Sequence, residues 1–251
     1  MFKEYFVLLF LGHVLGDFYV QTSKLATKKE KSMKWVLLHC LCYLGVMLLV
    51  SLPIISSDIA FAALMAAILH LMIDVVKFLY LASIRKKHKM TQVIDRNVFL
   101  IDQILHMVCL IGIAYWVVAG NTTINEWNGF KDFFKVISIP GSLVLCWVLS
   151  LLIIHKPANL LIQKLLMLYK PDSKEEDKKK DNNAGRFIGT VERIIMLIFL
   201  SIGQYSAIGL VLTAKSIARY DKISKEKDFA EYYLLGTLIS TSVVIVCAFL
   251  I

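Results

Sequence analysis

The feature that most constrains this chain is a repetition of apolar segments, each about as long as a lipid bilayer is thick. An α-helix rises about 1.5 Å per residue, so about 20 apolar residues cross the roughly 30 Å of hydrocarbon. The segments with this character are residues 4–22, 35–55, 59–83, 98–119, 136–155, 188–213 and 231–251. At 58% hydrophobic residues, the chain is too apolar to cover a water-soluble surface. We therefore predict an all-α, polytopic transmembrane helical bundle of about six to seven membrane segments.

Basic residues alternate between the loops that join these segments. The first loop holds five lysines, the second holds no basic residue, and the third again holds five basic residues. Because Lys and Arg accumulate in cytoplasmic loops, we predict that the N-terminus lies outside and that residues 23–34, 84–97 and 170–187 are cytoplasmic. The net charge of +9 has the same explanation, so we expect no nucleic-acid partner. The N-terminal segment has no cleavage site and is expected to be retained.

A charged stretch divides the chain. Residues 170–187 contain KPDSKEEDKKKDNN, which is too polar to pack and is typical of a solvated linker. We expect a four-helix transmembrane unit at 1–120, a connecting helix and amphipathic segment at 121–169, and a C-terminal membrane unit at 188–251. A simple crossing at 188–213 would place the following basic loop outside, so we favour a re-entrant hairpin broken near Gly203-Gln204. An exception to the charge rule is the open alternative.

Polar side chains recur within the first four segments, many of them at a spacing of one helical turn. Residues four apart lie one above the other on the same helix face, which lets one helix offer two ligands to one metal ion. All these groups fall in the half of the bilayer next to the basic loops. Their identities are His13, Asp17 and Gln21 in the first segment, His39 in the second, His70, Asp74 and Lys77 in the third, and Asp102, Gln103 and His106 in the fourth.

The three buried aspartates require partners. An aspartate at bilayer depth costs about 2.5–3.5 kcal/mol, so unpaired ones are rare. Nitrogen and oxygen ligands without thiolate suit Zn²⁺, and would also accept Mn²⁺, Fe²⁺ or Ni²⁺. The predicted metal ligands are His13, Asp17, His70, Asp74 and His106. The other roles are general base or orienting residue for Asp102 or His39, and substrate binding for Gln21, Lys77 and Gln103.

Several alternatives stay open for this constellation. The candidate ligands outnumber those of one tetrahedral site, so a two-metal centre is one of them. The same groups would also serve a proton or cation transporter or channel, or a structural or regulatory protein with polar helix packing. The outer halves of these segments are apolar, which favours a site open on one side only.

The C-terminal unit has a weaker candidate site. Interfacial snorkelling and intramolecular pairing are the favoured explanation of Arg193, Lys215 and Arg219, and the alternative is a site for an anionic lipid headgroup or another phosphate-bearing ligand. The five cysteines all lie in apolar segments and are interpreted as packing residues. Asn121-Thr122-Thr123 fits a glycosylation sequon, which matters only in a secretory pathway.

The polar motifs carry a resemblance. HVLGDFYVQ, the isolated His39, HLMIDVVK and DQILH resemble an uncharacterised family of bacterial and phage inner-membrane proteins, catalogued as a domain of unknown function, over about residues 5–118. The tail GRFIGTVER…AKSIARY…AEYYLLGTLIS resembles a C-terminal extension seen on some bacterial members. The resemblance implies a location in the bacterial cytoplasmic membrane and the same domain division, and it adds no mechanism.

A looser resemblance is to membrane-bound metal-dependent hydrolases, including the alkaline ceramidase group, which gather His and Asp around zinc. This chain has His-xxx-Asp where those proteins have His-xxx-His. Our leading hypothesis is a metal-dependent membrane hydrolase that acts on a lipid at the cytoplasmic face. Its expected partners are membrane lipids, and the sequence leaves homo-oligomerisation open.

Overall fold

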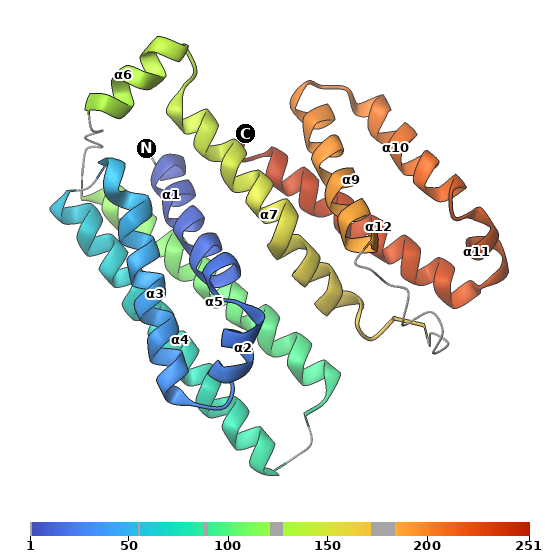
Figure 1. The fold of residues 1–251 in the computed structure, drawn as a ribbon, viewed down its shortest axis with the longest axis horizontal. Helices are drawn as coiled ribbons and strands as arrows, with labels where there is room; N and C mark the ends of the chain where they lie inside the picture. The colour runs from blue at the N-terminus through green and yellow to red at the C-terminus, as the bar shows by residue number, and fades with distance from the viewer. Residues whose placement is uncertain (1, 55, 88–89, 121–127, 172–183) are drawn as a thin grey trace. The chain divides into compact units, whose positions relative to one another are not determined.

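The computed structural model describes residues 2–54, 56–87, 90–120, 128–171 and 184–251. Throughout these residues the regular structure is helical and contains no strand (Figure 1). They include five helices long and apolar enough to cross a membrane, or up to six if the bent first pair forms one span. The prediction of an all-α helical bundle is therefore confirmed. The chain forms two compact units, Met1–Leu149 and Ser150–Ile251.

The first unit is built around four long helices. Helix α3 packs against α4, α4 against α5, and α1 against both α3 and α5. Shorter elements bend or join the long ones. In chain order the elements are α1 (Phe2–Val14), the π-helical turn η1 (Leu15–Val20), α2 (Ser23–Lys29), α3 (Met33–Ser51), the 3-10 turn η2 (Leu52–Ile54), α4 (Ser57–Lys87), α5 (Gln92–Ala119), α6 (Asn128–Ile137) and the first part of α7 (Gly141–Leu166).

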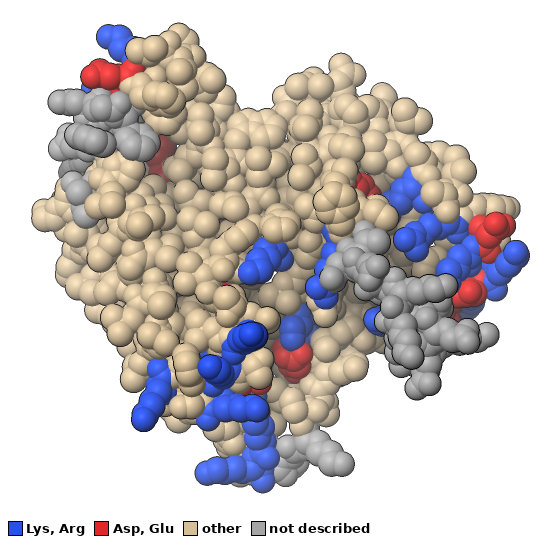
Figure 2. All heavy atoms as spheres, viewed as in Figure 1, with Lys and Arg blue, Asp and Glu red and all other residues tan. Residues whose placement is uncertain are grey.

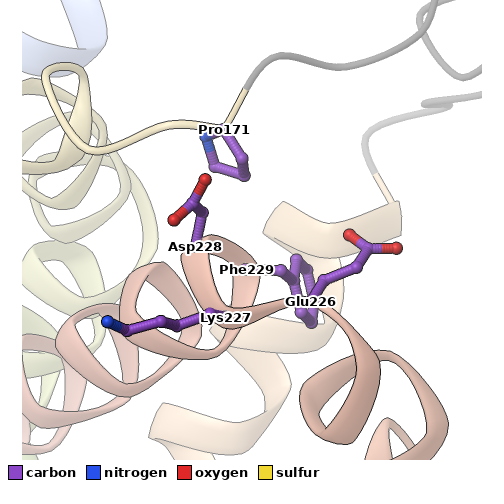
Figure 3. A pocket seen from close by; sticks show the side chains of 5 residues that line it. All are labelled: Pro171, Glu226, Lys227, Asp228 and Phe229. Atoms are coloured by element: carbon purple, nitrogen blue, oxygen red, sulfur yellow. The ribbon is translucent and has the colours of Figure 1, made fainter.

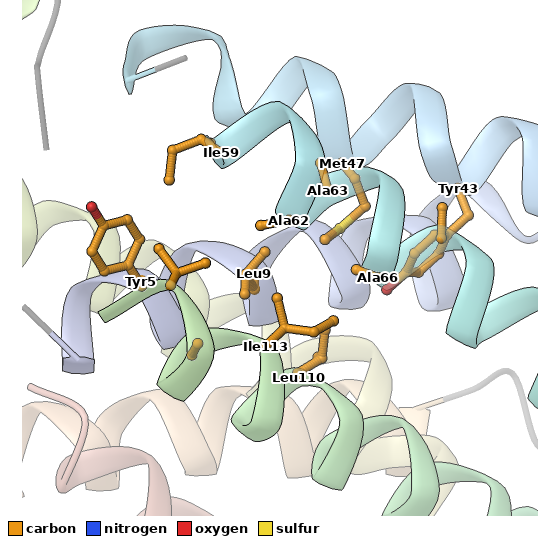
Figure 4. Close-up of a cluster of buried hydrophobic side chains, with 13 residues drawn as sticks. Tyr5, Leu9, Tyr43, Met47, Ile59, Ala62, Ala63, Ala66, Leu110 and Ile113 are labelled. Atoms are coloured by element: carbon orange, nitrogen blue, oxygen red, sulfur yellow. The ribbon is translucent and has the colours of Figure 1, made fainter. Parts of the chain in front are cut away.

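An apolar core fills one half of this bundle. Figure 4 shows Tyr5 and Leu9 of α1, Leu110 and Ile113 of α5, and small residues of α4 around a common interior. The contributing face of α4 contains Ile59 and four alanines, whose short side chains let neighbouring helices approach closely. These alanines are Ala62, Ala63, Ala66 and Ala67.

The other half begins where the first span bends. Helix α1 ends in the π-helical turn η1, and α2 leaves that span at an angle of 90°. Thr22 is the N-cap residue of α2, and its hydroxyl accepts a hydrogen bond from the backbone N–H of Leu25 (3.2 Å). Threonine is a common residue at this position. Arg85 of α4 donates to the Glu30 carboxylate that follows α2 (2.6 Å). The first and third basic loops therefore lie at the same end of the unit.

The surface carries the same asymmetry. Figure 2 shows that Lys and Arg side chains gather at the end of the first unit where α2 and the end of α4 lie. The adjoining surface of the same unit is largely uncharged in this view. This distribution fits two basic loops on one side of a membrane, and the sidedness itself stays a prediction.

The second unit contains the rest of α7, with α9 (Ala184–Ser201), α10 (Tyr205–Ile217), α11 (Tyr220–Lys225) and α12 (Lys227–Ala248). Helix α9 packs against α10 and α12. The break expected near Gly203-Gln204 is present: α9 ends at Ser201, and Gly203 adopts φ 72°, which glycine tolerates. A single straight helix over 188–213 is therefore wrong, because α10 packs back against α9.

Two predictions fall on residues outside the described ranges. The sequon Asn121-Thr122-Thr123 lies there, as does most of the expected linker, residues 172–183. The domain division at 120, 169 and 187 therefore stays a prediction. The boundary between the two compact units lies within α7, between Leu149 and Ser150.

Candidate metal centre

Seven histidines and aspartates converge in the first unit from five helical elements: α1, η1, α3, α4 and α5. Each of these residues is at most 8% exposed, so all seven are buried polar residues. The seven residues are His13, Asp17, His39, His70, Asp74, Asp102 and His106.

Four of these side chains meet at their tips. The Nε2 atom of His39 lies 3.1 Å from both Asp17 Oδ1 and His70 Nε2. Asp74 Oδ2 lies 3.7 Å from His39 Nε2 and 3.4 Å from His70 Nε2. His70 Nε2 lies 3.7 Å from Asp17 Oδ1. We call Asp17, His39, His70 and Asp74 the tetrad.

Five of the six ligand-atom pairs of the tetrad have separations close to those of a tetrahedral metal site. With metal–ligand distances of about 2.0–2.1 Å, tetrahedral nitrogen and oxygen ligands lie about 3.3–3.4 Å from one another. The five separations given above, from 3.1 to 3.7 Å, bracket that value. Hydrogen bonds alone do not account for all five, because each imidazole Nε2 carries at most one proton. The arrangement therefore fits a shared cation better than a set of pairwise hydrogen bonds.

Lysines border the tetrad on its more open side. Lys29 of α2 donates to Asp74 Oδ2 (2.6 Å) and to Gln21 Oε1 (2.9 Å). Lys77 of α4 donates to Asp102 Oδ2 (2.8 Å). These side chains are partly exposed, at 10% for Lys29 and 27% for Lys77, so the centre adjoins the surface through them.

Gln103 connects two of the carboxylates. Its Nε2 donates to Asp17 Oδ2 and to Asp102 Oδ2, both at 3.2 Å. The three residues predicted to bind substrate, Gln21, Lys77 and Gln103, therefore all contact the cluster or its lysines. None of these contacts shows a substrate.

Two contributors were missed from the sequence. Lys29 resembles any other lysine of a basic loop, and only the bend after η1 brings it to Asp74. Tyr43 stacks on His70, with ring centres 3.9 Å apart, and its hydroxyl lies 3.3 Å from His13 Nδ1. Its position four residues after His39, on the same face of α3, was the available signal.

A glycine makes the position of Tyr43 possible. A Cβ atom on Gly16 would lie 2.7 Å from Tyr43 Cδ2, which is too close for two carbon atoms. The absence of a side chain at Gly16 therefore lets α3 approach η1 and brings His39 to Asp17.

A second buried polar cluster lies in the second unit. Arg193 is 2% exposed, and its three nitrogens donate to Ile154 O (3.1 Å), Ser240 Oγ (3.2 Å) and Asn159 Oδ1 (2.8 Å). The carbonyl of Ile154 lies in the turn of α7 that precedes Pro157. In the described part of the chain no carboxylate lies within 4.0 Å of this guanidinium. Arg193 thus joins α7, α9 and α12.

The other predicted members of the C-terminal anion site are Lys215 and Arg219, and they do not share the hydrogen-bond partners of Arg193. Lys215 donates to the Glu192 carboxylate (3.0 Å) and to Thr237 Oγ1 (3.3 Å). Arg219 is exposed at the end of α10. The structure therefore does not join the three into one site. A surface pocket of this unit is lined by Pro171, Glu226, Lys227, Asp228 and Phe229 (Figure 3), and we assign it no role.

The fold and the centre define a class: a helical bundle, with helices long and apolar enough to span a membrane, around a buried histidine–aspartate cluster. The chain belongs to the family described as "Protein of unknown function (DUF3307)", which matches residues 5–132. The match covers all seven clustered residues and extends past the resemblance expected over about 5–118. No curated protein and no solved structure matches the chain. A bacterial or phage membrane origin stays a prediction.

Proposed function

We propose that this chain is a metal-dependent integral membrane hydrolase whose tetrad binds Zn²⁺. The observation that carries the proposal is the set of five ligand-atom separations between 3.1 and 3.7 Å. We place the protein in the bacterial cytoplasmic membrane with its N-terminus outside and the centre toward the cytoplasm, where the basic loops lie.

We change the roles of His39 and His13 from those expected from the sequence, and we leave His106 out of the tetrad. His39 becomes a metal ligand, together with Asp17, His70 and Asp74, instead of a general base. His13 lies beside the tetrad with Tyr43 on its Nδ1, so this pair is placed to accept and pass on a proton. Zinc bound by the tetrad would supply Lewis acidity, and an activated water would have to be its fifth ligand, because the tetrad already provides four.

The charges of the centre favour an anionic substrate group. Asp17, Asp74 and Asp102 carry three negative charges, and Lys29 and Lys77 carry two positive ones. A divalent cation then leaves a net charge of +1 if the histidines are neutral (−3 + 2 + 2). Because an uncompensated charge at membrane depth is costly, an anion is the expected partner. A lipid phosphate presented at the membrane surface satisfies this condition.

The distribution of polar groups favours an enzyme over a transporter. A relay across the bilayer requires polar groups along its whole path. Here the half of the bundle beyond Tyr43 is filled by apolar side chains such as Leu9, Leu110 and Ile113 (Figure 4). The centre adjoins the surface at Lys29 and Lys77. A substrate that reaches the centre there would enter and leave on the same side of the bundle.

The test is a reaction with and without metal. The full chain is purified in detergent, stripped with a chelator, reloaded with Zn²⁺ and incubated with a panel of phospholipids and ceramides, and products are measured by mass spectrometry. We expect headgroup or acyl-chain release by the zinc-loaded parent and a loss of at least about 100-fold in His39→Gln. His155→Gln, which changes a histidine outside the centre, is the control. Equal product from the stripped, loaded and His39→Gln proteins would contradict the proposal.

A further inference from the structure

His106 is the least satisfied side chain of the centre. It is 2% exposed, and neither of its ring nitrogens has a hydrogen-bond partner among the described residues. A buried neutral imidazole without partners forfeits a hydrogen bond at its N–H and another at its free nitrogen. The tetrad does not include His106, so a metal ion in the tetrad leaves both nitrogens unexplained.

Asp102 has an unsatisfied oxygen next to it. Lys77 and Gln103 donate to Asp102 Oδ2, whereas the buried Oδ1 has no partner among the described residues. The two residues are one turn apart on α5, with His106 Nδ1 3.9 Å from Asp102 Oδ2. One ligand atom each from Asp74, Asp102 and His106 lie within 4.8 Å of one another. The unsatisfied groups thus face the carboxylate that the tetrad already uses.

We infer that the centre holds a second divalent cation, bound by Asp102, His106 and Asp74, with the Asp74 carboxylate bridging to the tetrad. This inference rests on the proposed function and deepens it. A carboxylate has two oxygens and can bind one metal with each, as in two-metal hydrolytic sites. The two positions have different characters. The tetrad offers four protein ligands, which close a tetrahedral site, whereas the second position offers three and leaves room for water or substrate.

The lysines predict that the second position binds metal more weakly. Lys77 donates to Asp102 Oδ2, which belongs to the second position alone, whereas Lys29 donates to Asp74 Oδ2, the oxygen that the tetrad uses. The second position therefore has both ammonium groups on its carboxylates, and the tetrad has one. With both lysines in place, two divalent cations give the centre a charge of +3 (−3 + 2 + 4). A cation at the second position must therefore displace ammonium groups or enter with an anion. We expect inorganic phosphate to tighten the weaker binding step and to leave the tighter one unchanged.

Metal stoichiometry tests this inference on the full chain in detergent. The stripped parent, His106→Gln and Asp102→Asn are equilibrated with Zn²⁺, separated from free metal and analysed for zinc per chain. We expect about two ions for the parent and about one for either variant. His155→Gln is the matched control and should keep about two. Loading with Mn²⁺ gives a second readout, because only a pair of close ions produces an exchange-coupled paramagnetic resonance spectrum. That spectrum should disappear in His106→Gln.

The outcomes separate the two claims. One ion in the parent, unchanged in both variants and without exchange coupling, overturns the second position and leaves the tetrad intact. No stoichiometric ion in the parent overturns the proposed function as well. Thermal melting of the metal-free proteins shows whether a variant is folded. If His106→Gln does not fold, the zinc content of Asp102→Asn is used instead. A folded Asp102→Asn that still binds two ions would contradict the second position.

Discussion

The two units bury polar side chains in different ways. In the second unit, the Arg193 guanidinium donates from each nitrogen to a neutral oxygen at 2.8–3.2 Å. In the first unit, His39, His70 and His106 lie among carboxylates, yet ring nitrogens of all three have no hydrogen-bond partner among the described residues. Both clusters are buried between packed helices, so burial alone does not distinguish them.

The contrast gives a criterion for distinguishing a structural polar cluster from a ligand-binding site. A buried polar group needs a partner, since leaving it unsatisfied costs about 1–3 kcal/mol. Where the protein supplies every partner, as for Arg193, the cluster needs no ligand and joins helices. Where carboxylates and imidazoles meet without enough protons to pair them all, as in the tetrad, we propose that a bound cation completes the cluster. The following changes test that distinction.

The largest effect is expected for Asp74→Asn. This change removes one negative charge from the tetrad at nearly constant volume, so the helix should still insert while zinc affinity falls by more than about 100-fold. Metal content and thermal stability are measured on the same preparation. Asp58→Asn, an exposed position on the same helix, is the control. A destabilised variant of a parent that never held stoichiometric metal would show that Asp74 only pairs with Lys29.

A stability effect without a metal effect is expected for Arg193→Met. The change removes the donors to Ile154, Asn159 and Ser240, and the acceptors left behind should cost about 1–3 kcal/mol of unfolding free energy. Zinc content should not change. Arg186→Met, on the exposed part of the same helix, is the control. A variant as stable as the parent would mean that the neutral acceptors around Arg193 do not stabilise the unit.

A smaller effect is expected for Gly16→Ala. The added Cβ would lie 2.7 Å from Tyr43 Cδ2, so Tyr43 or α3 must shift, which would move His39 relative to Asp17. We expect about 1 kcal/mol of destabilisation and a loss of zinc affinity of less than about 10-fold. Gly45→Ala is a matched control, because a Cβ there meets nothing within 4 Å. Equal zinc affinities for the two variants would mean that the close approach at Gly16 does not position His39 relative to Asp17.

The helices could be predicted because apolar length and one-turn spacing are properties of a single helix. The same spacing placed His13 with Asp17 and His70 with Asp74. It could not show which neighbouring helix each face meets, and for that reason His39 was assigned as a base and Lys29 was overlooked. The contact of Lys29 with Asp74 depends on a 90° bend, and that of Tyr43 with His70 depends on a glycine. Both are properties of packing between segments.

The measurement that most directly tests the central claim is zinc-edge X-ray absorption of the purified, zinc-loaded chain. The tetrad predicts a first shell of nitrogen and oxygen atoms at about 2.0–2.1 Å, including imidazole scattering. It predicts no sulfur ligand, although Cys40 lies 3.8 Å from Asp74 Oδ2 and is a competing candidate. Loss of the imidazole signal in His39→Gln should accompany loss of zinc. A sulfur shell at about 2.3 Å, or a chain that retains no zinc, would contradict the tetrad.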